Sequence, residues 1–426
     1  MGPGEGSQNS GGYLLMPTLV LKNIGFLITV DPDQPGELGS ISQAALVFQD
    51  DKIAWLGKQI DLPNLYLGVP SVDCQNGVVM PGLIDCHTHV VFAGTRLGEF
   101  VMRARGATYA EIMQAGGGIR NTTQATREAS VEELTHLALP RLSRMLARGV
   151  TSIEAKTGYG LSTESELKML EVMRALELEQ PIEISPTFLG AHAVPPEYEG
   201  SAKNYVDDIN LHMLPQIAEQ GIATACDVFV EKGAFSVEQA RSIFETAKLL
   251  GLKCRVHAEQ LSHSGGALLA AEVGALSASH LEFIDDNDRK ALAQKGVVAE
   301  LLPIAQEFLG MKQLASGRAL CEAGVKVAIG TDLNPGSSMC DDLHLAARLA
   351  VTRGGLTCEE AVLGVTRHAA CALGRSNVGM LRVGLQADVC VMELSHPFAW
   401  LYDWSTNPVK MVFKKGKAVT KIPKAF

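Results

Sequence analysis

The middle of the chain alternates short apolar runs with segments whose apolar residues recur at helical spacing. This alternation is typical of βα units, in which each buried parallel strand is followed by a helix that covers the sheet. Helical spacing is clear over 164–176, 236–250 and 287–295. Glycines typical of helix ends stand at or just before several strand starts, at Gly149, Gly251, Gly296 and Gly324.

Eight strands are predicted in this region, and eight βα units favour a closed barrel over an open sheet. The predicted strands are 83–87, 149–155, 182–189, 223–230, 253–257, 275–280, 297–302 and 325–331. No Gly-x-Gly-x-x-Gly motif follows the first strand, so a dinucleotide-binding site is not expected.

Both ends of the chain carry short β-patterned runs separated by turn residues. These runs are 19–28, 44–48 and 52–56 at the start, and 387–393, 409–413 and 418–421 at the close. We expect the two ends to pair. The predicted architecture is an α/β fold, a distorted (β/α)8 TIM barrel over 81–384 with a composite β-sandwich built from 14–80 and 385–426. The Gly/Ser/Asn-rich residues 1–13 are predicted to be a disordered tail.

Composition narrows the class of protein. The 426 residues carry a net charge of -10 and no run of Lys and Arg, which argues against nucleic acid as a general partner. No charge-free apolar stretch reaches the roughly 18 residues of a membrane span, and the first residues do not resemble a secretion signal. The nine cysteines are scattered, odd in number and never in Cys-x-x-Cys spacing. They indicate reduced thiols, so we expect a cytoplasmic protein without a membrane partner.

A candidate metal motif follows the apolar run 78–84, where His87 and His89 stand two residues apart. Residues two apart in an extended chain point to the same face, so both imidazoles are expected to enter one space. Imidazole nitrogen suits zinc or ferrous iron. The alternative is a buried strand end with two hydrogen-bonded histidines.

Polar residues also stand at the ends of several other predicted strands, where chemistry gathers in a βα barrel. They are Glu154 and Tyr159 at the second strand, His192 after the third, His257 at the fifth, His280 at the sixth and Asp332 after the eighth. A purely structural barrel gives no reason for polar residues at so many strand ends.

Three imidazoles and one carboxylate, from His87, His89, His257 and Asp332, form a set that suits zinc or iron with an open position for water. Asp332 could ligate the metal, take a proton from its water, or merely cap a helix before Asn334. His257 could instead be a core histidine. His280 could carry a proton, and its alternative is also core packing.

A second metal is not expected. Some related sites use a carboxylated lysine that bridges two ions. Neither Lys156 nor Lys232 is predicted to stand squarely at the end of its strand. We therefore expect one divalent ion, zinc or iron, and the sequence does not distinguish the two metals.

These residues resemble the amidohydrolase superfamily, with a Pro-Gly-x-Ile-Asp-x-His-x-His strand, histidines on the fifth and sixth strands, and Gly-Thr-Asp on the eighth. The terminal β segments also look like the superfamily's composite sandwich. Within it, the segments 87–96, 154–161, 257–260 and 330–336 resemble the imidazolonepropionase family, and the similarity runs from about Leu19 to the C-terminus. The resemblance implies hydrolytic opening of 4-imidazolone-5-propanoate to N-formimidoyl-L-glutamate in histidine degradation, and it suggests a homodimer.

The resemblance also implies roles for individual residues. A metal-bound hydroxide would attack a ring carbon beside nitrogen, with Asp332 and His280 as proton carriers. Arg96 would bind the carboxylate of a small carboxylated imidazolone substrate. The remaining expected substrate contacts are Tyr159, His192, Gln260, Asn334, Gly336 and Ser337. Some family members carry Glu at the position of Gln260, and an amide cannot act there as a base.

Two alternatives stay open at this stage. The ligand set alone would also serve another cyclic amidohydrolase or a deaminase of an amino-heterocycle, and Arg96 and Tyr159 discriminate against both. The other alternative is a catalytically inactive barrel that acts as an interaction protein. Such a protein usually lacks ligands, and none is missing here.

Overall fold

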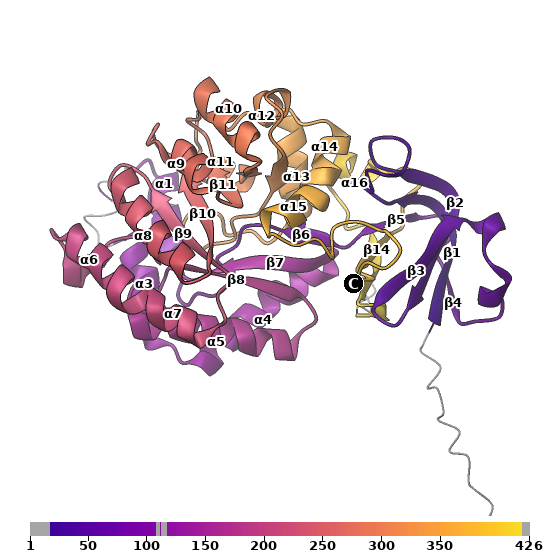
Figure 1. Ribbon diagram of the computed structural model, residues 1–426, viewed down its shortest axis with the longest axis horizontal. Coiled ribbons are helices and arrows are strands. Elements are labelled where there is room, and N and C mark those ends of the chain that lie inside the picture. The colour runs from indigo at the N-terminus through magenta and orange to yellow at the C-terminus, as the bar shows by residue number, and fades with distance from the viewer. Residues whose placement is uncertain (1–17, 108–110, 112–116, 420–426) are drawn as a thin grey trace, which may run out of the picture.

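The computed structural model describes residues 18–107, 111 and 117–419, and the tail predicted over 1–13 lies outside them. Two sheets organise the described chain (Figure 1). One is an eight-stranded parallel sheet that curls into a nearly closed barrel with helices around it. The other is a mixed sheet built from both ends of the chain, which lies at one side of the barrel. The predicted fold class is thereby confirmed.

The barrel strands are hydrogen-bonded in the order β13-β12-β11-β10-β9-β8-β7-β6, so neighbours in the sheet are also neighbours in sequence. All eight predicted strands are present, with ends that differ by a few residues from those expected. They are β6 (Leu83–Asp85), β7 (Val150–Lys156), β8 (Glu183–Ala191), β9 (Ala225–Val230), β10 (Lys253–Ala258), β11 (Ser277–His280), β12 (Val298–Leu301) and β13 (Val327–Ile329).

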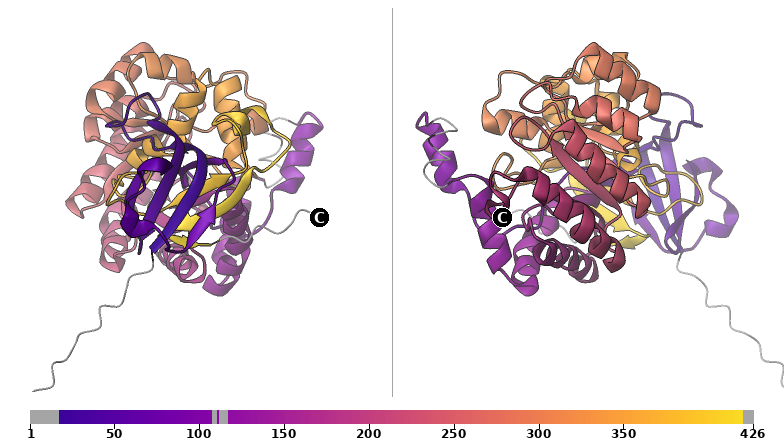
Figure 2. Two further views of the ribbon diagram at one scale, coloured as in Figure 1. Left: turned by 90° about the vertical axis from the view of Figure 1, so that its right-hand side faces the viewer. Right: turned by 60° about the vertical axis from the view of Figure 1, so that its left-hand side comes forward.

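Helices cover the outer face of the barrel (Figure 2). The three helices predicted from apolar spacing are confirmed as α5, α8 and α10, and Gly149, Gly251, Gly296 and Gly324 all have the positive φ typical of a helix-ending glycine. The α-helices are α1 (Leu97–Ala104), α3 (Ile119–Glu128), α4 (Val131–Ala147), α5 (Thr163–Glu179), α6 (Ala202–Asp208), α7 (Leu214–Gln220), α8 (Val237–Leu249), α9 (Gly266–Val273), α10 (Asp286–Lys295), α11 (Pro303–Leu309), α12 (Gly317–Glu322), α13 (Leu343–Thr352), α14 (Cys358–Gly364), α15 (Arg367–Ala372) and α16 (Ala399–Tyr402). Shorter helical turns are η1 (Gln59–Asp61), η2 (Asn64–Tyr66), η3 (Pro196–Tyr198) and η4 (Ile209–Met213).

The barrel closes through the segments that follow its first and last strands. Asp332 donates its backbone N–H to the carbonyl of His87 at 3.0 Å, and His89 donates to the carbonyl of Leu333 at 2.9 Å. Thr88 and Leu333 form an isolated parallel bridge between these segments. We call this pairing of residues 87–89 with 332–333 the closure seam.

The mixed sheet joins the two ends of the chain, as predicted. Its order is β16-β15-β14-β5-β1-β2-β3, with β4 paired to β1. Figure 2 (left) shows the indigo N-terminal strands beside the yellow C-terminal ones. Val79 pairs with Leu27 on one side and with Val391 on the other. The strands are β1 (Thr18–Ile28), β2 (Ser40–Gln49), β3 (Lys52–Lys58), β4 (Ser71–Asp73), β5 (Val78–Pro81), β14 (Val389–Met392), β15 (Val409–Lys414) and β16 (Lys417–Ala418).

The last strand was predicted over 418–421, but β16 begins one residue earlier, at Lys417, which pairs with Lys414 of β15. Its residues 420 and 421 lie outside the described chain.

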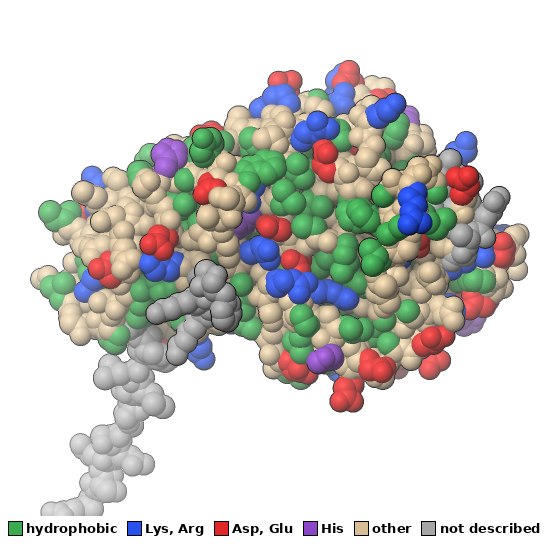
Figure 3. All heavy atoms as spheres, turned by 180° about the vertical axis from the view of Figure 1, so that it is seen from behind, with side chains coloured by type: hydrophobic (Ala, Val, Ile, Leu, Met, Phe, Trp, Pro, Cys, Tyr) green, Lys and Arg blue, Asp and Glu red, His purple; other side chains and the backbone are tan. Residues whose placement is uncertain are grey.

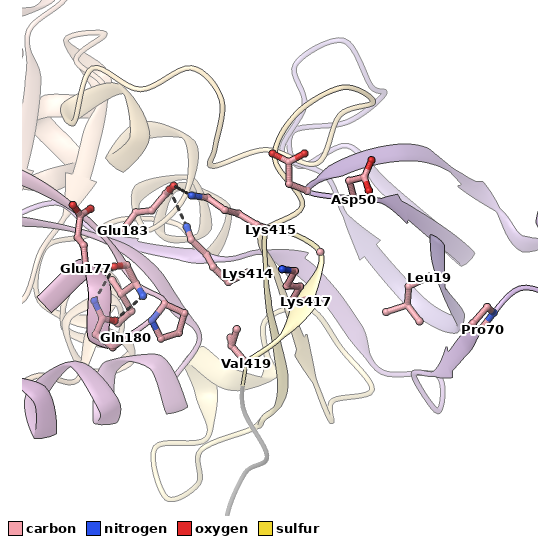
Figure 4. Close-up of a pocket in the computed structure, with 14 residues that line it drawn as sticks. Leu19, Asp50, Pro70, Glu177, Gln180, Glu183, Lys414, Lys415, Lys417 and Val419 are labelled. Atoms are coloured by element: carbon pink, nitrogen blue, oxygen red, sulfur yellow. Dashed lines mark hydrogen bonds and ion pairs between the residues drawn. The ribbon is translucent and has the colours of Figure 1, made fainter. Parts of the chain in front are cut away.

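A cavity of about 980 Å³ is lined by residues of both the mixed sheet and the barrel (Figure 4). Lys414 and Lys415, at the end of β15, reach across to Glu183 at the start of β8. Their ammonium groups lie 3.0 and 2.7 Å from its carboxylate oxygens. Glu183 is therefore an ionic link between the two sheets.

The surface seen from behind mixes acidic and basic side chains (Figure 3). No helix within the described residues is long and apolar enough to cross a membrane.

Candidate metal centre and active site

A small cavity of about 110 Å³ lies where the barrel strands end, and most of the predicted site residues line it. It is lined by His89, Arg96, Ile119, Tyr159, His192, Phe229, His257, Gln260, His280, Asp332, Asn334 and Ser337. Two further predicted residues lie beside it: His87 contacts Asp332, and Gly336 lies against Arg96. The structure therefore brings together all of the predicted site residues.

The four predicted metal ligands lie close together, and His87 belongs to two clusters of possible donors, one with His89 and Asp332 and the other with His257 and His280. The Nε2 atoms of His87 and His89 each lie 3.5 Å from Oδ1 of Asp332. The ring of His257 lies 4.6 Å from that of His87 between centroids. All four residues are at most 3% exposed. Such an arrangement offers several donor atoms to a single ion.

The donor atoms fit a divalent metal. His87 Nε2 and His257 Nε2 are buried and have no hydrogen-bond partner among the described residues. A buried polar atom without a partner is costly, and a metal ion would satisfy these nitrogens. Burial lowers the pKa of His87 and His89 well below the ordinary value and that of His257 to about 4. The imidazoles are therefore neutral, the form that binds metal.

The His-x-His segment differs from the expected strand. β6 ends at Asp85, so His87 and His89 lie in the loop beyond it. Thr88 holds this loop extended by pairing with Leu333, and its hydroxyl donates to the carbonyl of Glu154 at 2.7 Å. Side chains therefore still alternate between two faces beyond the end of β6, because the closure seam keeps the backbone extended where the regular strand pairing has stopped.

His280 and Asp332 have unusual backbone conformations, with φ of 75° and 54°. Residues other than glycine rarely adopt such angles, and strain of this kind gathers at functional sites. Burial raises the pKa of Asp332 to about 6. Burial disfavours the charged form of His280, but the Glu282 carboxylate, 3.8 Å from its Nδ1, outweighs that effect and raises the pKa. The cavity thus holds an acid and a base that could exchange protons.

Arg96 is already held by an acidic neighbour. Its Nε donates to Oε1 of Glu99 at 2.9 Å, and its Nη2 donates to Oε2 at 2.7 Å. These two bonds leave Nη1 and the second hydrogen of Nη2, on the outer edge of the guanidinium, for another acceptor. A Cβ at Gly336 would lie only 1.9 Å from Arg96 Nη1, so the absence of a side chain at 336 makes room for the guanidinium. The expected anion clamp is therefore limited to this outer edge.

Aromatic rings form one wall of the cavity. His192 stacks on His89 with centroids 5.2 Å apart, and Tyr159 lies 5.4 Å from His192. The Nδ1 of His192 is 3.0 Å from the carbonyl of Gly158, so this nitrogen carries the proton and Nε2 is left as an acceptor. Burial raises the pKa of Tyr159, which is therefore a hydroxyl donor at neutral pH.

The loop after β13 is shaped by Asn334. Its Oδ1 accepts hydrogen bonds from the backbone N–H groups of Gly336 and Ser337, both at 2.8 Å. Its Nδ2 donates to the carbonyl of Asp332 at 2.7 Å. Such local bonding is typical of Asn in turns. Asn334 therefore builds the loop that presents Ser337, in addition to lining the cavity itself.

Several contacts behind the ligands were not anticipated from the sequence. His87 Nδ1 lies 3.1 Å from both Glu300 Oε2 and Ser279 Oγ. His257 Nδ1 lies 3.0 Å from Asp227 Oδ2. The available signal was a charged residue within an otherwise apolar strand, as Asp227 is in β9 and Glu300 in β12.

The position predicted for Lys156 was wrong. It is the last residue of β7, because the strand runs one residue further than expected. Its ammonium group lies 2.7 Å from Glu154 Oε1 and 2.8 Å from Asp227 Oδ2. The nitrogen is thus engaged by two carboxylates beneath the cavity. Lys232 lies beyond the end of β9.

This barrel, with its histidine-rich cavity, defines a hydrolase of the amidohydrolase class, and the Amidohydrolase family matches residues 78–419. Imidazolonepropionase of Shewanella baltica (strain OS185) is 44% identical over 395 residues, which cover 92% of this chain and 97% of that protein. The protein of the same name from Shewanella sp. (strain MR-4) is 45% identical, with 92% and 96% covered. The chain therefore belongs to the imidazolonepropionase family. In fold it is also similar to A. niger ochratoxinase, with a TM-score of 0.70, 21% identity and 95% of each chain covered.

Proposed function

We propose that the protein hydrolyses the ring C–N bond of 4-imidazolone-5-propanoate to give N-formimidoyl-L-glutamate in histidine degradation. The observation that carries the proposal is a cavity in which neutral, unpartnered imidazole nitrogens face a carboxylate, in a chain 44% identical to an imidazolonepropionase. The cavity volume of about 110 Å³ suits a single-ring substrate.

We propose that one divalent ion, zinc or iron, is held by His87, His89, His257 and Asp332. When bound, the ion would supply a water of lowered pKa for attack on the ring. The donor set fits either metal, since both accept imidazole and carboxylate ligands.

The residues around the ion position the substrate and move protons. The outer edge of Arg96 would bind the propanoate carboxylate through two parallel hydrogen bonds. Tyr159 and His192 would contact the substrate from the aromatic wall, with Gln260, Asn334, Gly336 and Ser337 as the remaining contacts. Asp332 accepts a proton from the attacking water, and His280 donates one to the departing ring nitrogen.

We further propose a cytoplasmic enzyme that works as a homodimer, without nucleic acid or membrane as a partner. All nine cysteines are unpaired in the structure, which supports a reducing compartment. The homodimer rests on the family alone.

Incubation with freshly prepared 4-imidazolone-5-propanoate tests the function. Metal-replete protein should form N-formimidoyl-L-glutamate, detected by mass spectrometry as the substrate plus one water. A chelator or the Asp332→Asn substitution should lower the rate by about a thousandfold or more, because both remove the activated water. The control is Asp207→Asn, since Asp207 is a partly exposed residue of α6 that does not line the cavity. Absence of product from metal-replete protein would overturn the proposal.

A further inference from the structure

A chain of buried charges lies directly beneath the proposed metal ligands. Its members alternate in sign, and each side chain is at most 1% exposed. In spatial order they are Glu300, Arg255, Glu154, Lys156 and Asp227, drawn from strands β12, β10, β7 and β9. Burying five charges is costly unless each is paired, so the arrangement needs a specific reason.

Asp227, at one end of the chain of buried charges, contacts His257 at two points. Asp227 Oδ2 lies 3.0 Å from the imidazole Nδ1, and Asp227 Oδ1 accepts the backbone N–H of His257 at 3.2 Å. A carboxylate beside Nδ1 favours the proton at that nitrogen and leaves the lone pair on Nε2. Asp227 therefore holds the backbone of this ligand and places a carboxylate beside its ring.

The middle of the chain of buried charges contacts the His-x-His segment. Glu154 Oε2 accepts the backbone N–H of Thr88 at 3.3 Å, and the backbone N–H of Lys156 donates to the carbonyl of Thr88 at 2.9 Å. Thr88 stands between His87 and His89. Glu300, at the far end, contacts Nδ1 of His87 at 3.1 Å.

Lys156 lies between the two acidic residues that make these contacts, Asp227 and Glu154. Its ammonium group is within 2.8 Å of Asp227, which holds His257, and within 2.7 Å of Glu154, which holds Thr88. Without the ammonium group of Lys156, the buried carboxylates of Glu154 and Asp227 would face each other with no cation between them. Each would then turn away from the imidazole or backbone group that it now holds.

We propose that Lys156 is a positioning residue that fixes the strand bearing His257 relative to the His-x-His loop, and thereby sets the geometry of the metal site. It acts through Asp227 and Glu154 and does not touch the metal or the substrate. This role rests on the proposed metal site and is independent of which substrate the enzyme hydrolyses.

Replacement of Lys156 by methionine tests the role, with a matched control in the same chain. Lys414 is also a buried lysine between two carboxylates, 2.6 Å from Asp388 and 3.0 Å from Glu183, but it lies between the mixed sheet and the barrel. Both variants and the parent are loaded with Co²⁺. The visible spectrum is recorded, and loss of the ion to a chelator is timed.

Lys156→Met should release Co²⁺ about 10 to 100 times faster than the parent and shift its visible bands, as expected when the partners behind metal ligands are lost. Lys414→Met should leave both the rate and the bands unchanged. Equal behaviour of the two variants would overturn the role, whether both release the ion quickly or neither does.

A second experiment starts from Asp227, and its first part applies even if Lys156→Met fails to fold. Asp227→Asn keeps the shape of the side chain but weakens its hold on His257, and it should also speed the release of Co²⁺. Since Lys156 acts partly through Asp227, the double variant should release the ion more slowly than the product of the two single effects predicts. Unchanged release from Asp227→Asn would overturn the proposal, as would multiplicative effects in the double variant. Failure of the substrate assay alone would leave these measurements unaffected.

Discussion

Three of the imidazoles at the cavity have a protein oxygen close behind their Nδ1 atom. Glu300 holds Nδ1 of His87, Asp227 holds Nδ1 of His257, and the carbonyl of Gly158 holds Nδ1 of His192. Acceptors at Nδ1 fix the tautomer and stop the rings from rotating. The reactive face of the site is therefore set by residues that a substrate never contacts.

The carboxylate contact proposed for Arg96 can be tested by substitution. Substitution by lysine should leave metal content unchanged but lower kcat/KM about 10- to 100-fold, because an ammonium group cannot hold both Glu99 and a carboxylate in fixed geometry. Steady-state kinetics with 4-imidazolone-5-propanoate and metal analysis check both parts.

The control for that substitution is Arg105→Lys. Arg96 directly precedes α1 and Arg105 directly follows it. Arg105 is exposed and does not line the cavity. It should have parent kinetics. Unchanged kinetics for Arg96→Lys would remove Arg96 from the substrate site.

At the scale of elements, the closure seam places three proposed ligands on two adjoining segments. Gly330, the residue after β13, lets these segments approach closely. A Cβ at this position would lie 2.9 Å from the Cβ of His87 and 3.2 Å from its backbone nitrogen. The site therefore depends on a contact between backbones as well as on its ligands.

Gly330→Ala should consequently lower the free energy of unfolding by about 1–3 kcal/mol, the usual cost of overpacking a core. It should also reduce metal retention, because His87 must shift. Thermal unfolding and metal analysis measure the two effects.

Gly98→Ala is the matched change, since a Cβ there meets nothing within 4 Å and the residue lies in α1. It should be neutral or slightly stabilising, as alanine favours helix. Full metal retention by Gly330→Ala would show that the seam tolerates expansion.

Apolar periodicity was sufficient to predict the strands and the main helices, because buried parallel strands and amphipathic helices are defined by local pattern. It was not sufficient to predict where β6 ends. That end depends on Thr88 meeting Leu333, a residue far along the chain. The two ligands His87 and His89 were predicted from their spacing, whereas the charges behind them belong to strands whose neighbours only the folded barrel defines.

For the whole molecule, Glu183 links the mixed sheet to the barrel and makes stability depend on pH. Burial alone would raise its pKa, but Lys414, Lys415 and Arg375 outweigh this and hold it well below the ordinary value. The unfolded chain then binds more protons than the folded one as the pH falls below about 4.3, the usual glutamate pKa. The stabilisation by Glu183 is therefore full above that pH and is lost progressively below it.

Glu183→Gln should accordingly be less stable than the parent at pH 7, and the difference should shrink as the pH falls from about 5 to 3. Urea unfolding at several pH values measures it. Glu179→Gln, at the exposed end of α5, is the control and should follow the parent at every pH. A difference that grows toward acid pH would contradict the proposed link.

The pairing of β5 with β14 has a consequence for how the protein is made. β5 leads through Gly82 into β6 and the His-x-His loop, and Gly82 donates its N–H to the carbonyl of Asp388. A ribosome synthesises β5 early but β14 only after the whole barrel, and such distant pairings form slowly. β5, which leads to the His-x-His loop, therefore cannot pair with β14 until synthesis is nearly complete. A nascent chain halted before β14 would carry every proposed ligand and still lack the strand that secures the first of them.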